Sequence, residues 1–124
     1  MISGLAYVEI AVSDFKKSLY FYTQVLGLSV YGETVSNEDG LWCQLVSKNG
    51  NTNIAIWEPV FTISKVSESP TIVPIFFVEN IRLFAENLKS KKVIFTEEIR
   101  ERPGYLITTI LDPDQNQLQL VEKI

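Results

Sequence analysis

Residues 7–28 constrain the fold more than any other stretch, because a strand, a helix start and a helix stop follow one another there. The first six of these residues alternate between two unlike sets, which is the period-2 pattern of a strand with two different faces. Ser13 or Asp14 then offers a side-chain oxygen to the free amides of a helix. Gly27 favours a left-handed stop. Between cap and stop, an apolar stripe at helical spacing is made by Phe15, Leu19, Tyr22 and Leu26.

The same pattern returns after a shift of 66 residues. Residues 73–78 then align with residues 7–12, and Glu79-Asn80 aligns with Ser13-Asp14. The stripe carries over too, because Phe15, Ser18, Leu19 and Tyr22 align with Ile81, Phe84, Ala85 and Leu88. A repeat of half the chain length indicates two copies of one supersecondary unit, and a chance match between two strand-helix pairs is the alternative.

Strand and turn patterns fill the rest of each half. In the first half they predict strands at 28–35, 41–46 and 53–57, with turns at 36–40 and 48–51. In the second half they predict a helix at 81–91, strands at 71–78, 93–99, 105–111 and 117–122, and turns at 101–104 and 112–116. A weakly patterned stretch with a proline at each end predicts a linker at 59–70. The expected fold is therefore α+β, a single domain of two βαβββ modules at 1–58 and 71–124 that close one core together.

Composition excludes several functional classes. With a net charge of −4 and a pI of about 4.8, the chain has no basic field for phosphate backbones, so we expect no nucleic-acid partner. No apolar run approaches the roughly 18 residues of a membrane span, and no leader pattern opens the chain, so the cytoplasm is the default compartment. The chain has no histidine, so any metal site would need carboxylate and amide ligands.

Two motifs resemble a known superfamily. Residues 12–28, Val-Ser-Asp-Phe-Lys-Lys-Ser-Leu-Tyr-Phe-Tyr-Thr-Gln-Val-Leu-Gly-Leu, resemble the opening motif of the vicinal oxygen chelate superfamily, which includes glyoxalase I, bleomycin resistance proteins and extradiol dioxygenases. Residues 112–122, Asp-Pro-Asp-Gln-Asn-Gln-Leu-Gln-Leu-Val-Glu, resemble its closing turn and strand. The resemblance implies two βαβββ modules whose sheets curl around one cleft, a small organic ligand, and a homodimer.

The positions that this resemblance implies for a metal carry few side chains that could bind one. Where the family's enzymes hold a divalent metal, this chain has Tyr7, Ala55, Val73 and Gln119. One amide oxygen does not replace the hydration shell of a divalent cation, so we expect no metal and no cofactor. Gln115 also stands where glycine is usual, which predicts a non-glycine residue in a glycine-favouring conformation.

Period-2 alternation groups the side chains that would line the implied cleft. Alternation places Glu9 and Ala11 on the same strand face as Tyr7. In the same way, it places the residues two positions from Ala55, Val73 and Gln119 on the faces of those three residues. The predicted ligand-binding residues are Tyr7, Glu9, Trp42, Asn53, Trp57, Phe77, Tyr105 and Gln119. The register of the strand that carries Trp42 is not determined by the sequence. An aromatic lining with one carboxylate suits an aromatic or cationic organic molecule.

Each of these residues also has a purely structural interpretation. Tyr7 could fill an unused metal cavity, and Trp57 could pack in the core or in a dimer interface. Glu9 is costly in an apolar strand unless it is solvated or paired, and Arg100 or Arg102 could pair with it.

Two further groups of side chains suggest chemistry that we do not expect. Cys43 reads as a buried small hydrophobe rather than a nucleophile, since the chain has no histidine to activate it. Asp112 and Asp114 read as turn residues rather than an acid-base pair.

Three functions fit the pattern. The first is a metal-independent protein that binds an aromatic or cationic small molecule, and we favour it over enzymatic activity. The second is a lyase or isomerase of the glyoxalase type, or a dioxygenase-related enzyme, that uses Glu9 as base and Tyr7 as acid or a non-standard metal site. The third is a regulatory domain or subunit with a vestigial cleft.

Overall fold

A computed structural model describes residues 1–51, 53–62, 70 and 72–124. Two compact units make up the chain, residues 1–65 and 66–124, and each is described by itself below. Most of the predicted linker at 59–70 lies outside the described residues. No helix within the described ranges is both long and apolar enough to cross a bilayer.

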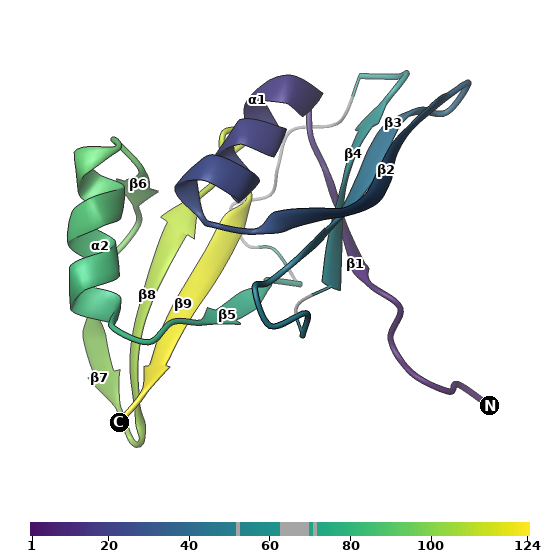
Figure 1. The fold of residues 1–124 in the computed structure, drawn as a ribbon. Helices are drawn as coiled ribbons and strands as arrows, with labels where there is room; N and C mark the ends of the chain where they lie inside the picture. The colour runs from purple at the N-terminus through teal and green to yellow at the C-terminus, as the bar shows by residue number, and fades with distance from the viewer. Residues whose placement is uncertain (52, 63–69, 71) are drawn as a thin grey trace. The chain divides into compact units, whose positions relative to one another are not determined.

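The first unit is a four-stranded sheet with one helical segment on one of its faces (Figure 1). The strand order is β1-β4-β3-β2, in which β1 and β4 run parallel and the other neighbours run antiparallel. The elements are β1 (Val8–Ala11), α1 (Phe15–Tyr20), the π-helical turn η1 (Phe21–Val25), β2 (Ser29–Asn37), β3 (Gly40–Val46) and β4 (Asn53–Pro59). This is the predicted order of strand, helix and three strands.

Two carboxylates receive the first amides of α1. Asp14 is the N-cap, and its Oδ1 accepts a hydrogen bond from the backbone N–H of Lys17 at 3.1 Å. Glu58, at the far end of β4, accepts from the backbone N–H of Phe15 at 2.7 Å. The second bond joins residues that are far apart in sequence, so it ties the helix start to the last strand of the unit.

The buried face of this helical segment differs from the predicted stripe. Phe15 and Tyr22 are buried as expected, but Leu19 and Leu26 are only half-buried. Ser18 and Phe21 are buried in addition to them. The π turn η1 accounts for Leu26, because a π turn holds more residues than an α turn and rotates the side chains that follow it. Ser18 and Leu19 lie before this turn, in α1. Gly27 ends the segment at a φ of +87°, which confirms the predicted left-handed stop.

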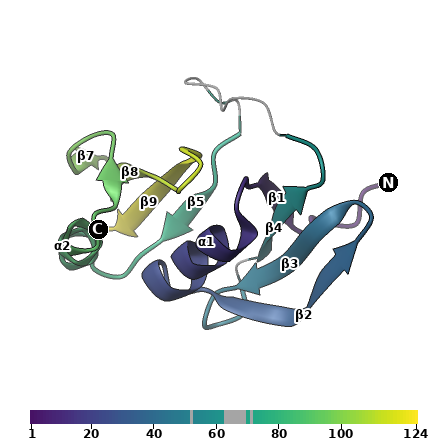
Figure 2. The ribbon, with the colours of Figure 1, turned by 90° about the horizontal axis from the view of Figure 1, so that it is seen from above.

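The second unit pairs its strands in the order β5-β9-β8-β6, with β7 also paired to β8, and α2 packs against β9 (Figure 2). Strands β5 and β9 run parallel, like β1 and β4 in the first unit. The elements are β5 (Ile75–Phe77), α2 (Ile81–Ser90), β6 (Ile94–Phe95), β7 (Arg100–Arg102), β8 (Tyr105–Leu111) and β9 (Gln117–Lys123). The α+β fold class is confirmed.

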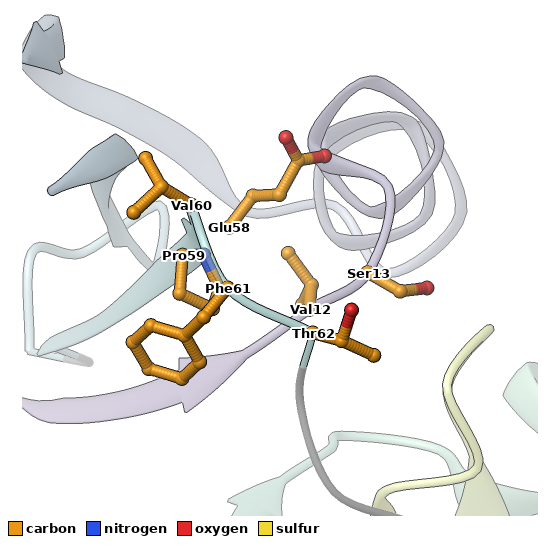
Figure 3. A pocket seen from close by; sticks show the side chains of 7 residues that line it. All are labelled: Val12, Ser13, Glu58, Pro59, Val60, Phe61 and Thr62. Carbon is orange, nitrogen blue, oxygen red and sulfur yellow. The ribbon is translucent and has the colours of Figure 1, made fainter. Parts of the chain in front are cut away.

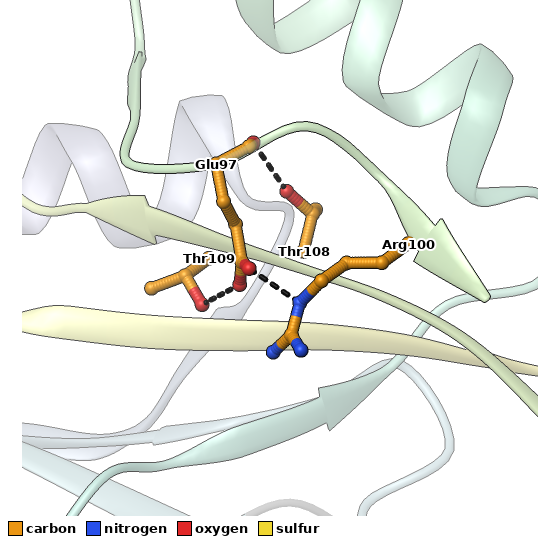
Figure 4. A network of polar contacts seen from close by, with 4 residues as sticks. All are labelled: Glu97, Arg100, Thr108 and Thr109. Carbon is orange, nitrogen blue, oxygen red and sulfur yellow. Dashed lines mark hydrogen bonds and ion pairs between the residues drawn. The ribbon is translucent and has the colours of Figure 1, made fainter. Parts of the chain in front are cut away.

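The predicted strand at 71–78 is longer than β5, which covers only Ile75–Phe77. The predicted strand at 93–99 is also wrong in its extent. Only β6 is a strand there, and the chain bends at Thr96 and Glu97 before β7 begins. The bend is held by Glu97, whose carbonyl accepts the Thr108 hydroxyl at 3.1 Å and whose carboxylate accepts the Thr109 hydroxyl at 2.7 Å (Figure 4). The predicted turn at 101–104 is accordingly shorter, because Arg100–Arg102 pairs with β8.

The helix starts of the two units are built alike. Asn80 caps α2 by accepting from the backbone N–H of Leu83 at 3.2 Å, and Glu122 accepts from the backbone N–H of Ile81 at 2.7 Å. Glu122 therefore does for α2 what Glu58 does for α1. The sequence shift falls from 66 residues at the helix starts to 64 at these two glutamates, so no constant shift aligns both ends.

The closing turn carries the predicted strained residue. Gln115 has a φ of +67°, in the left-handed region that costs a non-glycine residue about 1 kcal/mol or more. Replacing Gln115 with glycine is therefore expected to raise the free energy of unfolding by about 1 kcal/mol. The measurement is the denaturant midpoint. Glu86→Gly, on the exposed face of α2, is the control and should lose about 1 kcal/mol, because its backbone is helical. If Gln115→Gly lowered the free energy of unfolding as much as Glu86→Gly does, the backbone at Gln115 would not be strained.

Candidate functional site

The sheet of the first unit has two unlike faces. The face toward α1 is the core, with Ile10, Val12, Cys43, Leu45, Ile54 and Ile56 all buried. Register places the alternate residues on the opposite face, because Trp42 pairs with Trp57, which pairs with Ala11, and Gln44 pairs with Ala55, which pairs with Glu9. We call this opposite surface the aromatic face; its polar and aromatic members are Tyr7, Glu9, Trp42, Gln44, Asn53 and Trp57.

Trp42 is the centre of the aromatic face. Its indole Nε1 donates a hydrogen bond to Oε2 of Glu9 at 3.1 Å, and its ring lies 5.6 Å from the ring of Tyr7 at an angle of 59°. Strand β4 lies between the strands of Trp42 and Glu9, so the indole reaches across β4. At that crossing β4 carries Ala55, whose methyl group leaves room for the ring and is fully buried. The register of strand β3, open from sequence, is thereby settled.

The remaining members extend this surface in both directions. Gln44 Nε2 donates to Oδ1 of Asn53 at 3.4 Å, and the ring of Phe61 meets Trp57 edge-on at 5.7 Å. Glu9 and Asn53 are exposed, and Trp42 and Trp57 are half-buried. Glu9 keeps Oε1 without a partner among the described residues, since its one hydrogen bond there uses Oε2. The face therefore offers aromatic rings for stacking and one carboxylate oxygen for a cation or a donor.

A hollow of about 340 Å³ lies beside Phe61, where β1 and β4 end (Figure 3). It is lined by Val12, Ser13, Glu58, Pro59, Val60, Phe61 and Thr62. Glu58 is the one charged residue of this lining, and its Oε1 already accepts from the amide of Phe15. The aromatic face is the better candidate site, because it combines a carboxylate with three aromatic rings, whereas the lining of the hollow contains one ring, that of Phe61.

The residues at the implied metal positions do not fit a divalent cation. Ala55 and Val73 carry no donor atom, and Ala55 is covered by its neighbours. Across the described ranges, no three or more His, Cys, Asp or Glu side chains form a group that could hold a metal ion. The donor set is therefore wrong for the metal chemistry that the resemblance implies.

The predicted site residues of the second half lie on the sheet of the second unit. Phe77 is 70% exposed and Tyr105 is 41% exposed, while Gln119 is half-buried. They occupy the face of that sheet opposite α2, and Lys123 Nζ lies 5.0 Å from the centre of the Phe77 ring. The structure thus places Phe77, Tyr105 and Gln119 in the second unit. The other five predicted site residues lie together on the sheet of the first unit: Tyr7, Glu9, Trp42, Asn53 and Trp57.

Two of the structural interpretations can be compared with the contacts. Glu9 is solvated and bonded to Trp42, and Arg100 forms its ion pair with Glu97, at 2.5 Å from Nε to Oε1. Asp112 is 4% exposed and its carboxylate accepts from the backbone N–H groups of Asp114 and Asn116 at 2.9 and 2.8 Å, so it holds the closing turn as predicted.

Cys43 is fully buried, and burial raises the pKa of its thiol from 9.0 to about 11. Between these values the unfolded chain loses the thiol proton and the folded chain keeps it, so stability falls as the pH rises through this window. The thiol should lower the free energy of unfolding by about 2–3 kcal/mol between pH 9 and pH 11, because each pKa unit corresponds to about 1.4 kcal/mol. Denaturant unfolding across this range measures it, with Cys43→Ala as the reference for the slope. Identical slopes in the two proteins would contradict a buried thiol.

Sequence reasoning missed Gln44 and Phe61. Gln44 was detectable, because it follows Trp42 by two residues and must share its face once β3 is a strand. Phe61 lies after the end of β4, where no periodic pattern places a side chain.

Comparison with known proteins gives one family. The sequence profile of the Glyoxalase/Bleomycin resistance protein/Dioxygenase superfamily matches residues 4–120. The uncharacterized protein YwkD of Bacillus subtilis (strain 168) is 30% identical over 128 residues, which cover 99% of each chain.

Solved structures share the fold. The crystal structure of TnmS3, an antibiotic binding protein from Streptomyces sp. CB03234, superposes with a TM-score of 0.81 at 18% identity and covers 99% of this chain and 98% of its own. A superfamily member from Sphaerobacter thermophilus DSM 20745 superposes with a TM-score of 0.80 at 26% identity and covers 98% of each chain.

Proposed function

We propose that this chain, which belongs to the Glyoxalase/Bleomycin resistance protein/Dioxygenase superfamily, binds a small aromatic cation on the aromatic face without a metal ion. The observation that carries the proposal is the fixed position of the Trp42 indole, which is held to Glu9 and stands against Tyr7. A ring that is already oriented loses little conformational freedom on binding, so more of the stacking energy appears as affinity.

The chemistry of the face selects the ligand class. The half-buried rings of Trp42 and Trp57 offer apolar surface for a planar group, and Glu9 Oε1 offers a charge-assisted contact to a cation. TnmS3 shares the fold and is an antibiotic binding protein, which makes a binding role on this scaffold reasonable. The mismatch at Ala55 and Val73 favours binding over metal-assisted catalysis.

Intrinsic fluorescence can test the proposal, because both tryptophans of the chain belong to the aromatic face. Benzyltrimethylammonium is expected to change the emission saturably in protein treated with EDTA. Glu9→Gln should weaken its binding severalfold, since the neutral amide no longer attracts the quaternary ammonium. Glu38→Gln, in the exposed turn between β2 and β3, is the matched control and should bind like the parent protein.

A second variant separates the ring from its anchor. Trp42→Phe keeps an aromatic ring but removes the N–H that holds Glu9, so we expect a loss of several-fold and not the complete loss of binding. The proposal is wrong if protein purified without chelator carries one divalent ion per chain and EDTA abolishes binding, or if Glu9→Gln leaves the affinity unchanged.

A further inference from the structure

Strand β2 is a long and exposed edge of the first sheet. It ends the strand order β1-β4-β3-β2, so no described strand lies along its outer side. With nine residues it is the longest strand described, and all nine are exposed. Val30, Tyr31 and Val35 are large apolar residues, yet they are exposed at 42, 62 and 41%. The free backbone groups of such an edge are a template for pairing with another chain.

The sequence of β2 contains few of the features that keep an edge strand unpaired. Natural edge strands are commonly short, or they carry proline or lysine. β2 is long, and Ser29–Asn37 contains neither of these two residue types. Its one charged side chain is Glu33, at the middle of the strand. The remaining protection against pairing is therefore this carboxylate and the shape of the strand.

A bulge interrupts β2 at its middle. Tyr31 and Val35 pair with residues of β3 that are only two positions apart. Three residues of β2, 32–34, therefore stand opposite Cys43 alone. The chain enters the bulge at Gly32, whose φ of +75° lies in the left-handed region. A Cβ at Gly32 would meet no atom within 4 Å, so this position favours glycine for its backbone conformation and not for lack of space.

The bulge leaves two halves that are each too short to hold a second chain. Regular pairing with β3 covers residues 29–31 and residues 35–37, which are three residues on each side of the bulge. A bulge bends its strand and increases the local twist, so the two halves do not form one straight edge. An incoming strand would make hydrogen bonds along one half only, and so short a pairing does not offset the entropy lost by ordering it.

We propose that the bulge at residues 32–34 prevents the β2 edge from pairing with the β2 edge of a second copy of this chain. A second copy is the relevant partner, because two identical edges can pair antiparallel about a two-fold axis. In that arrangement Glu33 of one strand would face Glu33 of the other, so its charge opposes the same contact. The bulge has the larger effect, because Glu33 is exposed and solvent screens its charge.

Removing two residues from the bulge tests this proposal. Deletion of Gly32 and Glu33 leaves Thr34 as the single residue of the former bulge. The seven remaining residues of β2 then match the seven residues of β3 one to one, and no side chain turns to the other face. The shortened chain should have twice the assembly mass of the parent protein in sedimentation at equal concentration. The outward amide hydrogens of β2 should also exchange roughly tenfold more slowly than in the parent protein.

Glu33→Gln is the matched control, because it removes the same negative charge and keeps the bulge. It should keep the assembly mass of the parent protein. Circular dichroism and the thermal transition show whether the shortened chain is folded. If it is not, deletion of Glu33 and Thr34 is the second variant, because it restores the same one-to-one register with Gly32 opposite Cys43.

Four results would overturn this role of the bulge. A folded shortened chain could keep the assembly mass of the parent protein. It could associate without slower exchange in β2, which would place the contact elsewhere. Glu33→Gln could associate as strongly as the shortened chain, which would assign the protection to the charge. Both deletions could fail to fold, which would make the bulge a requirement of the fold itself. None of these results bears on the binding of benzyltrimethylammonium, so the two proposals are tested separately.

Discussion

Replacing Tyr22 with alanine is expected to lower the free energy of unfolding by about 4 kcal/mol. Tyr22 is fully buried and sits in the π turn next to Phe21, whose ring meets it edge-on at 5.3 Å. Truncation removes the largest fully buried side chain described and leaves a cavity that a rigid sheet face cannot fill by collapse. Such a loss is a large fraction of the roughly 5–15 kcal/mol by which native domains are stable, so the temperature of the thermal transition should fall clearly.

Tyr20 provides a matched control for this change. It is the same residue type two positions earlier, and its side chain is 65% exposed. Tyr20→Ala should change the stability by no more than about 0.5 kcal/mol. Chemical denaturation of the two variants, or the temperature of the thermal transition where Tyr22→Ala is too unstable, measures the difference. Similar losses would show that the π turn does not direct Tyr22 into the core.

Replacing either Glu58 or Glu122 with alanine is expected to cost about 2 kcal/mol. Each carboxylate accepts from the first amide of its helix at 2.7 Å, and each is half-buried, so water replaces the lost acceptor only in part. The carboxylate also lies at the positive end of the helix dipole, which adds to the loss. Glu58→Gln and Glu122→Gln should lose about half as much, because the amide oxygen still accepts the bond without a charge.

Glu38→Ala is the control for the loss of one negative charge, since Glu38 lies in an exposed turn. It should be neutral within about 0.5 kcal/mol. Equilibrium unfolding of all five variants gives the comparison. If Glu58→Ala or Glu122→Ala leaves the free energy of unfolding unchanged, these long-range caps do not stabilise the protein, and the N-caps Asp14 and Asn80 are sufficient.

The shared caps also explain why the repeat is hard to see in the sequence. The helices align after a shift of 66 residues, the helix stops at Gly27 and Lys92 after 65, and the capping glutamates after 64. The extra residue between helix start and stop in the first unit coincides with the π turn. A fixed shift therefore aligns the first strand and the helix, and it loses the closing strand, where Glu58 and Glu122 would have matched.

Local patterns in the sequence were sufficient for much of the fold. The alternation at 7–12, the cap at Asp14, the stop at Gly27 and the closing turn with Gln115 were all predicted, because each depends on neighbours within a few residues. The opening and closing motifs also pointed to the superfamily that the profile match establishes. Strand ends in the second half were less predictable, because Glu97 bends the chain through contacts with residues 11 and 12 positions away.

The candidate site shows what local patterns leave open. The resemblance implied that Tyr7 and residue 55 face one cleft, and alternation then added Glu9, Asn53 and Trp57, since side chains two residues apart in a strand share a face. Trp42 was included in the predicted site, but the register of its strand was left open, because a shift of one residue in β3 would have turned its side chain into the core. Only the pairing of β3 with β4 put Trp42 on that face, and only the small side chain of Ala55 let its indole cross to Glu9. The sequence by itself determined which residues each strand and helix could present, whereas the register between strands, which depends on hydrogen bonds along the whole sheet, decided which of them meet.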